Sequence, residues 1–217
     1  MSYLICRAAK APALNAGFDS DDWKDCRVLH VDVFRPEGSD HRPETRFRLQ
    51  YDDAGLYGLF SVRDRYVRCV AEKFQDPVCR DSCVEFFVQP SSSVGYLNFE
   101  FSAAGIMLAQ RHIRRSDKDD VRPLSADDVA DVRIFHSLPD RTDGEITEAI
   151  RYELGFFLPF SLFAATFNAP VPASGTAWRG NVYKCGDDTS HPHWASWQPV
   201  RRLNFHDPDC FGNLEFE

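Results

Sequence analysis

Two runs of alternating apolar and polar residues, at 83–89 and 96–101, constrain the fold of this chain most strongly. A period of two is typical of strands that bury one face only. The positions predicted to face a core are Val84, Phe86, Val88, Leu97, Phe99 and Phe101. Glu85, Asn98 and Glu100 then fall on the opposite faces. Two neighbouring strands could therefore line one surface with carboxylates and an amide, and that surface would bind a polar ligand, catalyse a reaction or face water.

Composition bounds the class of protein. The 217 residues are 43% hydrophobic and include 18 Phe, which is sufficient for the core of one domain spanning 1–217. With 33 acidic and 25 basic residues, the net charge of −8 disfavours nucleic acid and anionic membranes as partners. No apolar run approaches the roughly 18 residues of a membrane-spanning helix.

The cysteine count gives an expectation about the compartment. Seven cysteines are an odd number, scattered over a chain that is too long to need disulfides for folding. We expect reduced thiols and a cytoplasmic location, since the first residues lack a signal-peptide pattern. A secreted protein would follow if a leader had been removed.

Short strand-like segments bounded by turn residues dominate the chain. They lie at 28–34, 44–51, 56–62, 83–89, 96–102, 106–111, 132–138, 146–152, 177–185 and 214–216. Helical evidence is limited to 160–167 and to one turn within a charged loop at 117–131. About ten closely spaced strands with one or two short helical turns predict an all-β fold, a two-sheet antiparallel β-sandwich of jelly-roll type. Trp23 and Trp178 are expected in its core.

Four stretches, in this order along the chain, resemble the family 9 carbohydrate-binding module, a DOMON-like β-sandwich. They are Gly17-Phe18-Asp19 with Trp23; Leu49-Gln50-Tyr51-Asp52 with Leu56-Tyr57 and Asp64; Asp81-Ser82-Cys83-Val84-Glu85-Phe86; and Asp207-Pro208-Asp209-Cys210-Phe211-Gly212-Asn213-Leu214. The resemblance covers nearly the whole chain. It implies non-catalytic binding of a sugar or of a polysaccharide end of the xylan or cellulose type, with association with a glycoside hydrolase and with carbohydrate catabolism.

The resemblance also implies site residues. The polar ligand-binding positions are Glu85, Asn98, Glu100, Asn181 and Tyr183, and Phe205 falls where one of two stacking Trp residues is expected. The other Trp should precede Asp81, but Pro77-Val78-Cys79 stands there, so Trp197 or Trp194 would have to replace it. Bound calcium is often structural in such modules, and the candidate ligands are Asp19, Asp52 and Asp64.

The segment 185–206 supports an alternative function. Cys185, His191 and His193 could bind a soft metal, completed by Cys83, Cys79 or His206, although their spacing matches no standard zinc motif. Cys185 with a nearby His could also form a nucleophile pair in a redox or hydrolytic protein. Glu85 and Glu100 could be a glycosidase pair, but sequence cannot supply their separation. We favour binding over an enzyme, with no catalytic residues assigned.

Overall fold

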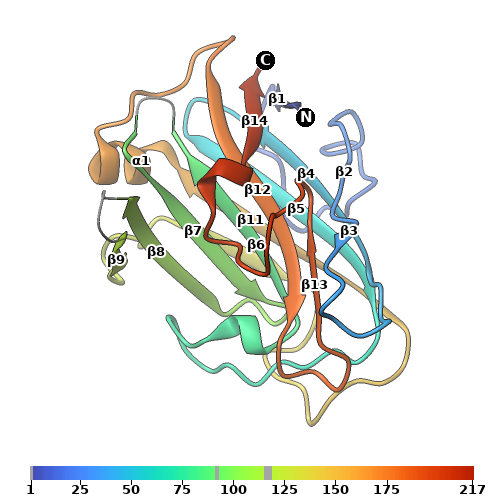
Figure 1. Ribbon diagram of the computed structural model, residues 1–217. Helices are drawn as coiled ribbons and strands as arrows, with labels where there is room; N and C mark the ends of the chain where they lie inside the picture. Colours follow the sequence, from blue (N-terminus) through green and yellow to red (C-terminus); the bar gives the residue numbers. More distant parts are fainter. Residues whose placement is uncertain (1, 91–92, 115–118) are drawn as a thin grey trace.

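The computed structural model describes residues 2–90, 93–114 and 119–217, which form a β-sandwich (Figure 1). The strands are β1 (Ser2–Arg7), β2 (Leu29–His30), β3 (Val33–Phe34), β4 (Glu44–Tyr51), β5 (Gly55–Asp64), β6 (Cys83–Gln89), β7 (Gly95–Ser102), β8 (Met107–Arg114), β9 (Asp119–Pro123), β10 (Arg133–His136), β11 (Ile150–Pro159), β12 (Ala177–Gly186), β13 (His193–Ser196) and β14 (Gly212–Phe216). The helical elements are α1 (Phe160–Phe167) and two single 3₁₀ turns, Val78–Arg80 and Pro208–Cys210. The predicted all-β class is confirmed.

Two sheets make up the sandwich. One has the order β14-β12-β6-β7-β8-β9, all antiparallel, and the other has the order β10-β11-β5-β4. Strand β12 has two neighbours along one edge: residues 177–180 pair with β14, and residues 183–186 pair with β13. We call the first the site sheet, since its outer face carries the predicted polar residues.

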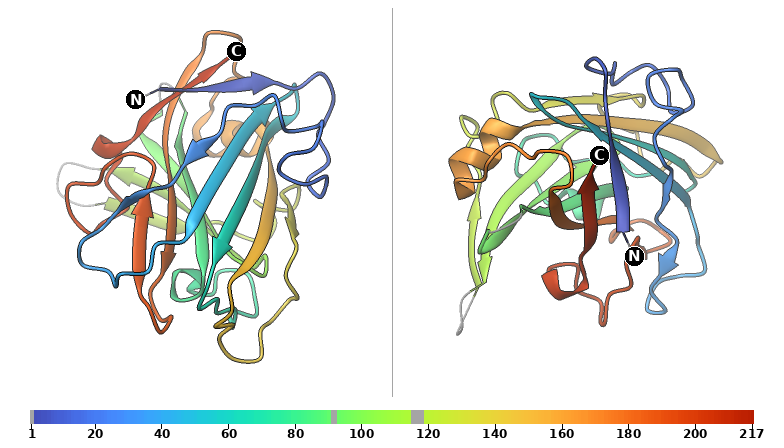
Figure 2. Two further views of the ribbon diagram at one scale, coloured as in Figure 1. Left: turned by 90° about the vertical axis from the view of Figure 1, so that its right-hand side faces the viewer. Right: turned by 90° about the horizontal axis from the view of Figure 1, so that it is seen from above.

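Strand β1 joins the two sheets and is the one departure from the expected antiparallel pattern. Its first residues pair in parallel with β14, and Cys6 and Arg7 pair in parallel with β4. The first and last strands of the chain consequently lie side by side (Figure 2). Local alternation does not predict the pairing of β1 with β14, because it joins residues more than 200 positions apart.

Phenylalanine rings fill the space between the sheets. Phe156 from β11 stacks on Phe86 and Phe101 of the site sheet, with ring centroids 5.6 and 5.3 Å away. Gly58 leaves room for Phe156, since a Cβ at this position would lie 2.2 Å from that ring. Each fully buried Phe contributes about 1.5–3 kcal/mol through removal of apolar surface from water. The strand positions predicted to face the core are all buried, and so are Trp23 and Trp178.

The helix α1 spans the predicted residues 160–167 and follows directly on β11. Asn168 ends it in the left-handed conformation and donates its backbone N–H to the Ala164 carbonyl oxygen, which is a common helix terminus. Within the described ranges, no helix has the length and apolar character required to cross a membrane.

Candidate functional site

The outer face of the site sheet brings the predicted strand carboxylates together. Glu85 and Glu100 are directly opposite in the β6–β7 register, and Tyr183 of β12 is opposite Glu85. Residues paired in this way share a face and lie close together. Glu85 is 2% exposed and Glu100 is 6% exposed. The shared face expected from the alternation is therefore present, but it is covered rather than open to water.

A segment that we call the covering loop, residues 197–211 between β13 and β14, crosses this face (Figure 1). The Phe205 ring stacks on Tyr183 with 4.1 Å between centroids, and the Tyr183 hydroxyl donates to the Phe205 carbonyl oxygen at 3.1 Å. Asn181 Nδ2 donates to the Gln198 carbonyl oxygen at 3.1 Å, and its Oδ1 accepts from the Gln198 amide at 2.9 Å. Both Asn181 and Tyr183 are fully buried, so they position the loop rather than present surface to a ligand.

A cavity of about 330 Å³ lies between the covering loop and the site sheet. It is lined by Cys79, Glu85, Glu100, Cys185, Asp187, Trp194, Leu203, Asn204, Phe205 and His206. Trp194 reaches it from β13, where it pairs with Cys185, and its Nε1 donates to Asp187 Oδ1 at 2.8 Å. Aromatic surface beside carboxyl oxygens suits a small ligand with both apolar faces and hydrogen-bonding groups.

The carboxyl groups of this cavity hold protons more tightly than usual. Burial raises the pKa of Glu100 to about 7, and the charge of Asp187 adds to this rise. Burial, followed by the charge of Glu100, raises the pKa of Glu85 well above its ordinary value. At neutral pH the pair therefore keeps a proton and can both donate and accept hydrogen bonds.

Asn98 supports Glu100 from within the sheet. Its Nδ2 donates to Glu100 Oε1 at 2.8 Å, and its Oδ1 lies 3.0 Å from His112 Nε2. Because Asn98 is fully buried and does not line the cavity, it can influence a ligand there only through Glu100.

Trp197 requires a correction as a stacking residue for this cavity. Its ring packs in the core, edge-to-face with Tyr3 at 6.4 Å, and it borders a different hollow beside β1 and β2. Trp194 takes the place in the cavity wall instead. Side chains alternate between the two faces of the sheet along 193–197, so Trp194 lies on the outer face with its partner Cys185, whereas Trp197 lies on the inner face.

The predicted soft-metal set of Cys185, His191 and His193 is also wrong, because the three side chains point in different directions. Gly186 pairs with His193, so His193 lies on the inner face, where its Nε2 is 2.8 Å from Lys184 Nζ. His191 stacks on Tyr66, with 3.7 Å between ring centroids. Cys185 lies on the outer face, and its thiol donates to Glu85 Oε1 at 3.1 Å.

The calcium candidates do not converge either. Asp19 pairs with Arg48 at 3.4 Å, and Asp52 caps its own turn by accepting from the backbone N–H groups of Ala54 and Gly55. Asp64 is buried against Lys184, whose Nζ lies 3.1 Å from its Oδ2. Calcium needs several oxygen ligands around one point. Each of these carboxylates instead has its own partners, so the three do not fit one calcium ion.

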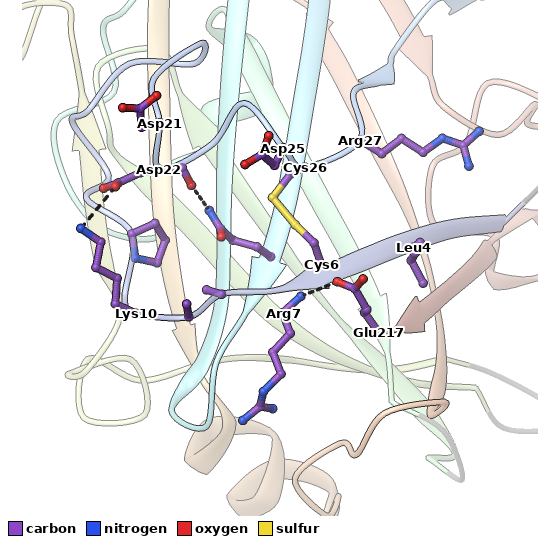
Figure 3. Close-up of a pocket in the computed structure, with 14 residues that line it drawn as sticks. Leu4, Cys6, Arg7, Lys10, Asp21, Asp22, Asp25, Cys26, Arg27 and Glu217 are labelled. Carbon is purple, nitrogen blue, oxygen red and sulfur yellow. Dashed lines mark hydrogen bonds and ion pairs between the residues drawn. A yellow bond between two sulfur atoms is a disulfide. The ribbon is translucent and has the colours of Figure 1, made fainter.

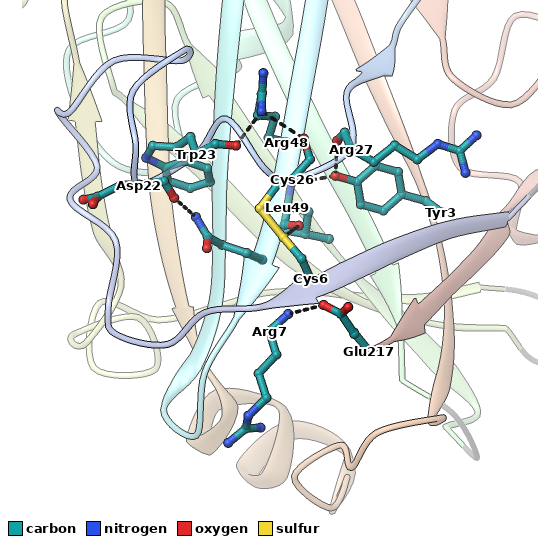
Figure 4. The surroundings of a disulfide bond; sticks show 11 residues. Tyr3, Cys6, Arg7, Asp22, Trp23, Cys26, Arg27, Arg48, Leu49 and Glu217 are labelled. Carbon is teal, nitrogen blue, oxygen red and sulfur yellow. Dashed lines mark hydrogen bonds between the residues drawn. A yellow bond between two sulfur atoms is a disulfide. The ribbon is translucent and has the colours of Figure 1, made fainter.

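The expectation that all seven cysteines are reduced is wrong for two of them. Cys6 of β1 and Cys26 form a disulfide, because the loop after β1 returns along the same edge (Figure 4). Cys69, Cys79, Cys83, Cys185 and Cys210 are free. Closing a loop with a sequence separation of 20 stabilises a fold by about 3 kcal/mol. A disulfide beside five free thiols leaves the compartment a prediction.

A larger cavity of about 560 Å³ borders this disulfide (Figure 3). Several of its charged side chains already have partners: Arg7 Nη2 pairs with Asp53 Oδ1 at 2.6 Å, and Lys10 pairs with Asp22 at 3.7 Å. Its described lining contains no aromatic side chain. The smaller cavity on the site sheet is therefore the better candidate for a specific ligand site.

Sequence reasoning missed several residues of the cavity wall, namely Asp187, Leu203, Asn204 and, as a wall residue, Cys79. Most belong to 185–206, the segment whose unusual composition already drew attention. Their approach to the site sheet depends on the path of the covering loop, for which local sequence carries no signal.

Comparison with known proteins agrees with the fold. The family model for carbohydrate-binding family 9 matches residues 20–216, so the chain belongs to this family. A structure from Bacteroides uniformis ATCC 8492, provisionally assigned to carbohydrate binding, is 29% identical with a TM-score of 0.86, and covers 100% of this chain and 99% of that one. No curated protein matches the chain.

Two structures of a family 9 module from Caldicellulosiruptor kristjanssonii share the fold at lower identity. The complex with cellotriose is 14% identical with a TM-score of 0.66, and covers 100% of this chain and 94% of that one. The complex with glucose is 16% identical with a TM-score of 0.57, and covers 99% and 95%.

Proposed function

We propose that the cavity between the covering loop and the site sheet binds a carbohydrate without altering it. The observation that carries this proposal is the joint lining of one small cavity by Trp194, Phe205 and the paired carboxyl groups of Glu85 and Glu100. A sugar presents apolar C–H faces to aromatic rings and a rim of hydroxyl groups to polar atoms. A carboxyl pair that retains one proton can accept from some hydroxyls and donate to others.

The placement of the two carboxyl groups favours binding over hydrolysis. Glycosidase carboxyl groups lie on either side of the bond that is cleaved, with substrate between them. Glu85 and Glu100 project from opposed positions of one sheet, and both are buried in the wall of the cavity. They therefore approach a ligand from one side.

We further propose that the ligand is a short β-linked glucan or xylan end, and that the chain serves a glycoside hydrolase as its binding partner. Family membership and the cellotriose complex of a related module support the first part. A cavity of about 330 Å³ suits one terminal sugar ring better than an internal stretch of polymer.

Calorimetry with glucose, xylose, cellotriose and xylotriose tests the proposal. We expect saturable binding of at least one of these sugars, weakened about tenfold by Trp194→Ala or Phe205→Ala, since one aromatic contact contributes about 1.4 kcal/mol. Trp197→Phe is the matched control and should leave the affinity unchanged, because Trp197 lies outside the cavity. Absence of binding to all four sugars at millimolar concentration would contradict the proposal.

A further inference from the structure

Three buried side chains, two of which line the cavity, form a compact group of potential metal ligands. The Sγ atoms of Cys83 and Cys185 and a carboxylate oxygen of Glu85 all lie within 4.8 Å of one another. Cys83 and Cys185 are directly opposite in the β6–β12 register, and Glu85 follows Cys83 by two residues on the same face. No other group of this kind occurs among the residues that the structure describes.

The separations suit a tetrahedral ion. Zinc binds thiolate sulfur at about 2.3 Å and carboxylate oxygen at about 2.0–2.2 Å, which places ligand atoms about 3.5–4 Å apart. Ligand atoms within 4.8 Å reach this geometry through small side-chain rotations. Two paired strands supply all three side chains, so the backbone positions are fixed before any ion arrives.

The surroundings of this group favour a cation. Cys79, Glu100 and Asp187 line the same cavity, whose described lining contains neither Lys nor Arg. Lys184 is adjacent to Cys185 in sequence, but its side chain lies on the inner face of the sheet, where Nζ is 3.1 Å from Asp64 Oδ2. In the absence of an ion the Cys185 thiol donates to Glu85 Oε1 at 3.1 Å, so these two groups already lie within contact distance.

The shell around the group is apolar. Val78 packs with Cys83 and Cys185, and Ile106, Leu108 and Trp194 cover them at partly buried positions. Such a shell limits access of water to the thiolates and strengthens their attraction for a metal ion.

We propose that Cys83, Glu85 and Cys185 bind a thiophilic divalent cation of the zinc type, with the fourth position facing the cavity. Cys79 or a water molecule would occupy that position, since Cys79 lines the same cavity. Two sulfur ligands favour zinc or cadmium over calcium or magnesium. This site shares Cys185 and Cys83 with the set considered from sequence, but it contains Glu85 and neither His191 nor His193.

The test uses the full chain, treated with a chelator and kept under mild reduction. Titration with Cd²⁺ should produce thiolate-to-cadmium charge-transfer absorption that saturates at one ion per chain, and Zn²⁺ should displace it. Cys83→Ser and Cys185→Ser should each lower the Cd²⁺ affinity at least tenfold. Glu85→Gln should weaken binding while keeping the absorption. Cys210→Ser, a half-buried thiol outside the group, is the matched control and should behave like the unmodified chain.

Cadmium NMR of the unmodified chain keeps the proposal testable if a variant fails to fold. A chemical shift typical of two or three thiolate ligands supports the site, and three would identify Cys79 as the fourth ligand. Binding with one thiolate or none would overturn it, as would charge-transfer absorption that survives in a folded Cys83→Ser/Cys185→Ser double variant. Sugar calorimetry on the chelator-treated chain tests the carbohydrate proposal separately.

Discussion

The two faces of β12 carry buried polar clusters of opposite character. On the inner face, Lys184 lies 3.1 Å from Asp64 and 2.8 Å from His193 Nε2, and His41 Nε2 lies 2.7 Å from Asp64 Oδ1. We call these four residues the inner cluster. On the outer face, the outer cluster of Cys83, Glu85, Cys185, Glu100 and Asp187 has thiols and carboxyl groups but no Lys or Arg.

The difference separates a structural role from a binding role. The inner cluster pairs its negative charge with a cation, and it links the two sheets because Asp64 belongs to β5 and Lys184 to β12. The outer cluster contains no cationic side chain, so its carboxyl groups Glu85 and Glu100 retain a proton instead of forming an ion pair. It also borders a cavity. Strand alternation assigns neighbouring residues, Lys184 and Cys185, to these two environments.

Removal of the Lys184 ammonium group from the inner cluster should have the largest effect on the free energy of unfolding. Lys184→Met leaves the Asp64 carboxylate buried without its ion-pair partner, and should lower the free energy of unfolding by about 3–5 kcal/mol. Urea unfolding at pH 7 measures this change. Lys24→Met is the control, because Lys24 pairs with Asp21 at the exposed surface, where such a pair contributes under about 1 kcal/mol. Equal losses in the two variants would contradict a supporting role for the inner cluster.

Acid should weaken the inner cluster next. Burial, then the charge of Lys184, lowers the pKa of His193 to about 3, so the unfolded chain takes up a proton below about pH 6.5 that the folded chain refuses. Although burial acts to raise it, the pKa of Asp64 falls to about 2 because of Lys184 and His41, which adds a further loss below about pH 4.

The free energy of unfolding should therefore fall by about 2–4 kcal/mol between pH 7 and pH 3 through these groups. Urea unfolding across this pH range, compared with His193→Gln, isolates the histidine part, and His30→Gln at an exposed position is the control. A parallel pH profile in His193→Gln would argue against a neutral buried imidazole.

The outer cluster should respond to pH in the opposite direction and by a smaller amount. Because the pKa of Glu100 is raised to about 7, the folded chain holds a proton that the unfolded chain releases near pH 4.5. Its stabilising contribution is present below pH 4.5 and is lost as pH rises to about 7. Glu100→Gln should therefore gain about 1–3 kcal/mol over the unmodified chain at pH 8, but little at pH 4. An equal effect at both pH values would mean that Glu100 is charged throughout.

The local pattern of the sequence predicts much of this fold. Alternation identified the core positions of β6 and β7, and the apolar run after Pro159 located α1 at 160–167. It did not locate β1, β9 or β13: 119–123 was expected within a charged loop, and β1 pairs with β14 at the other end of the chain. The number of strands was also underestimated, since β2, β3 and β13 have only two to four residues each.

The sequence predicts only those residues of the candidate site whose position follows from alternation within a single strand. Glu85 and Glu100 follow from alternation, whereas Trp194 and Asp187 depend on how β13 and the covering loop return over that face. The proximity of Cys83 to Cys185, 102 positions later, depends on the β6–β12 register, which no motif records. The disulfide between Cys6 and Cys26 likewise depends on where β1 lies.

The stacking of Phe205 on Tyr183 has a consequence for the rate at which a ligand binds. The Phe205 ring is held in place by the Tyr183 ring, and the Phe205 backbone carbonyl accepts a hydrogen bond from the Tyr183 hydroxyl. This part of the wall is therefore assembled before a ligand arrives, and little conformational entropy remains to be lost there. Association should follow a single exponential whose rate constant rises linearly with ligand concentration, without a slow phase of loop closure.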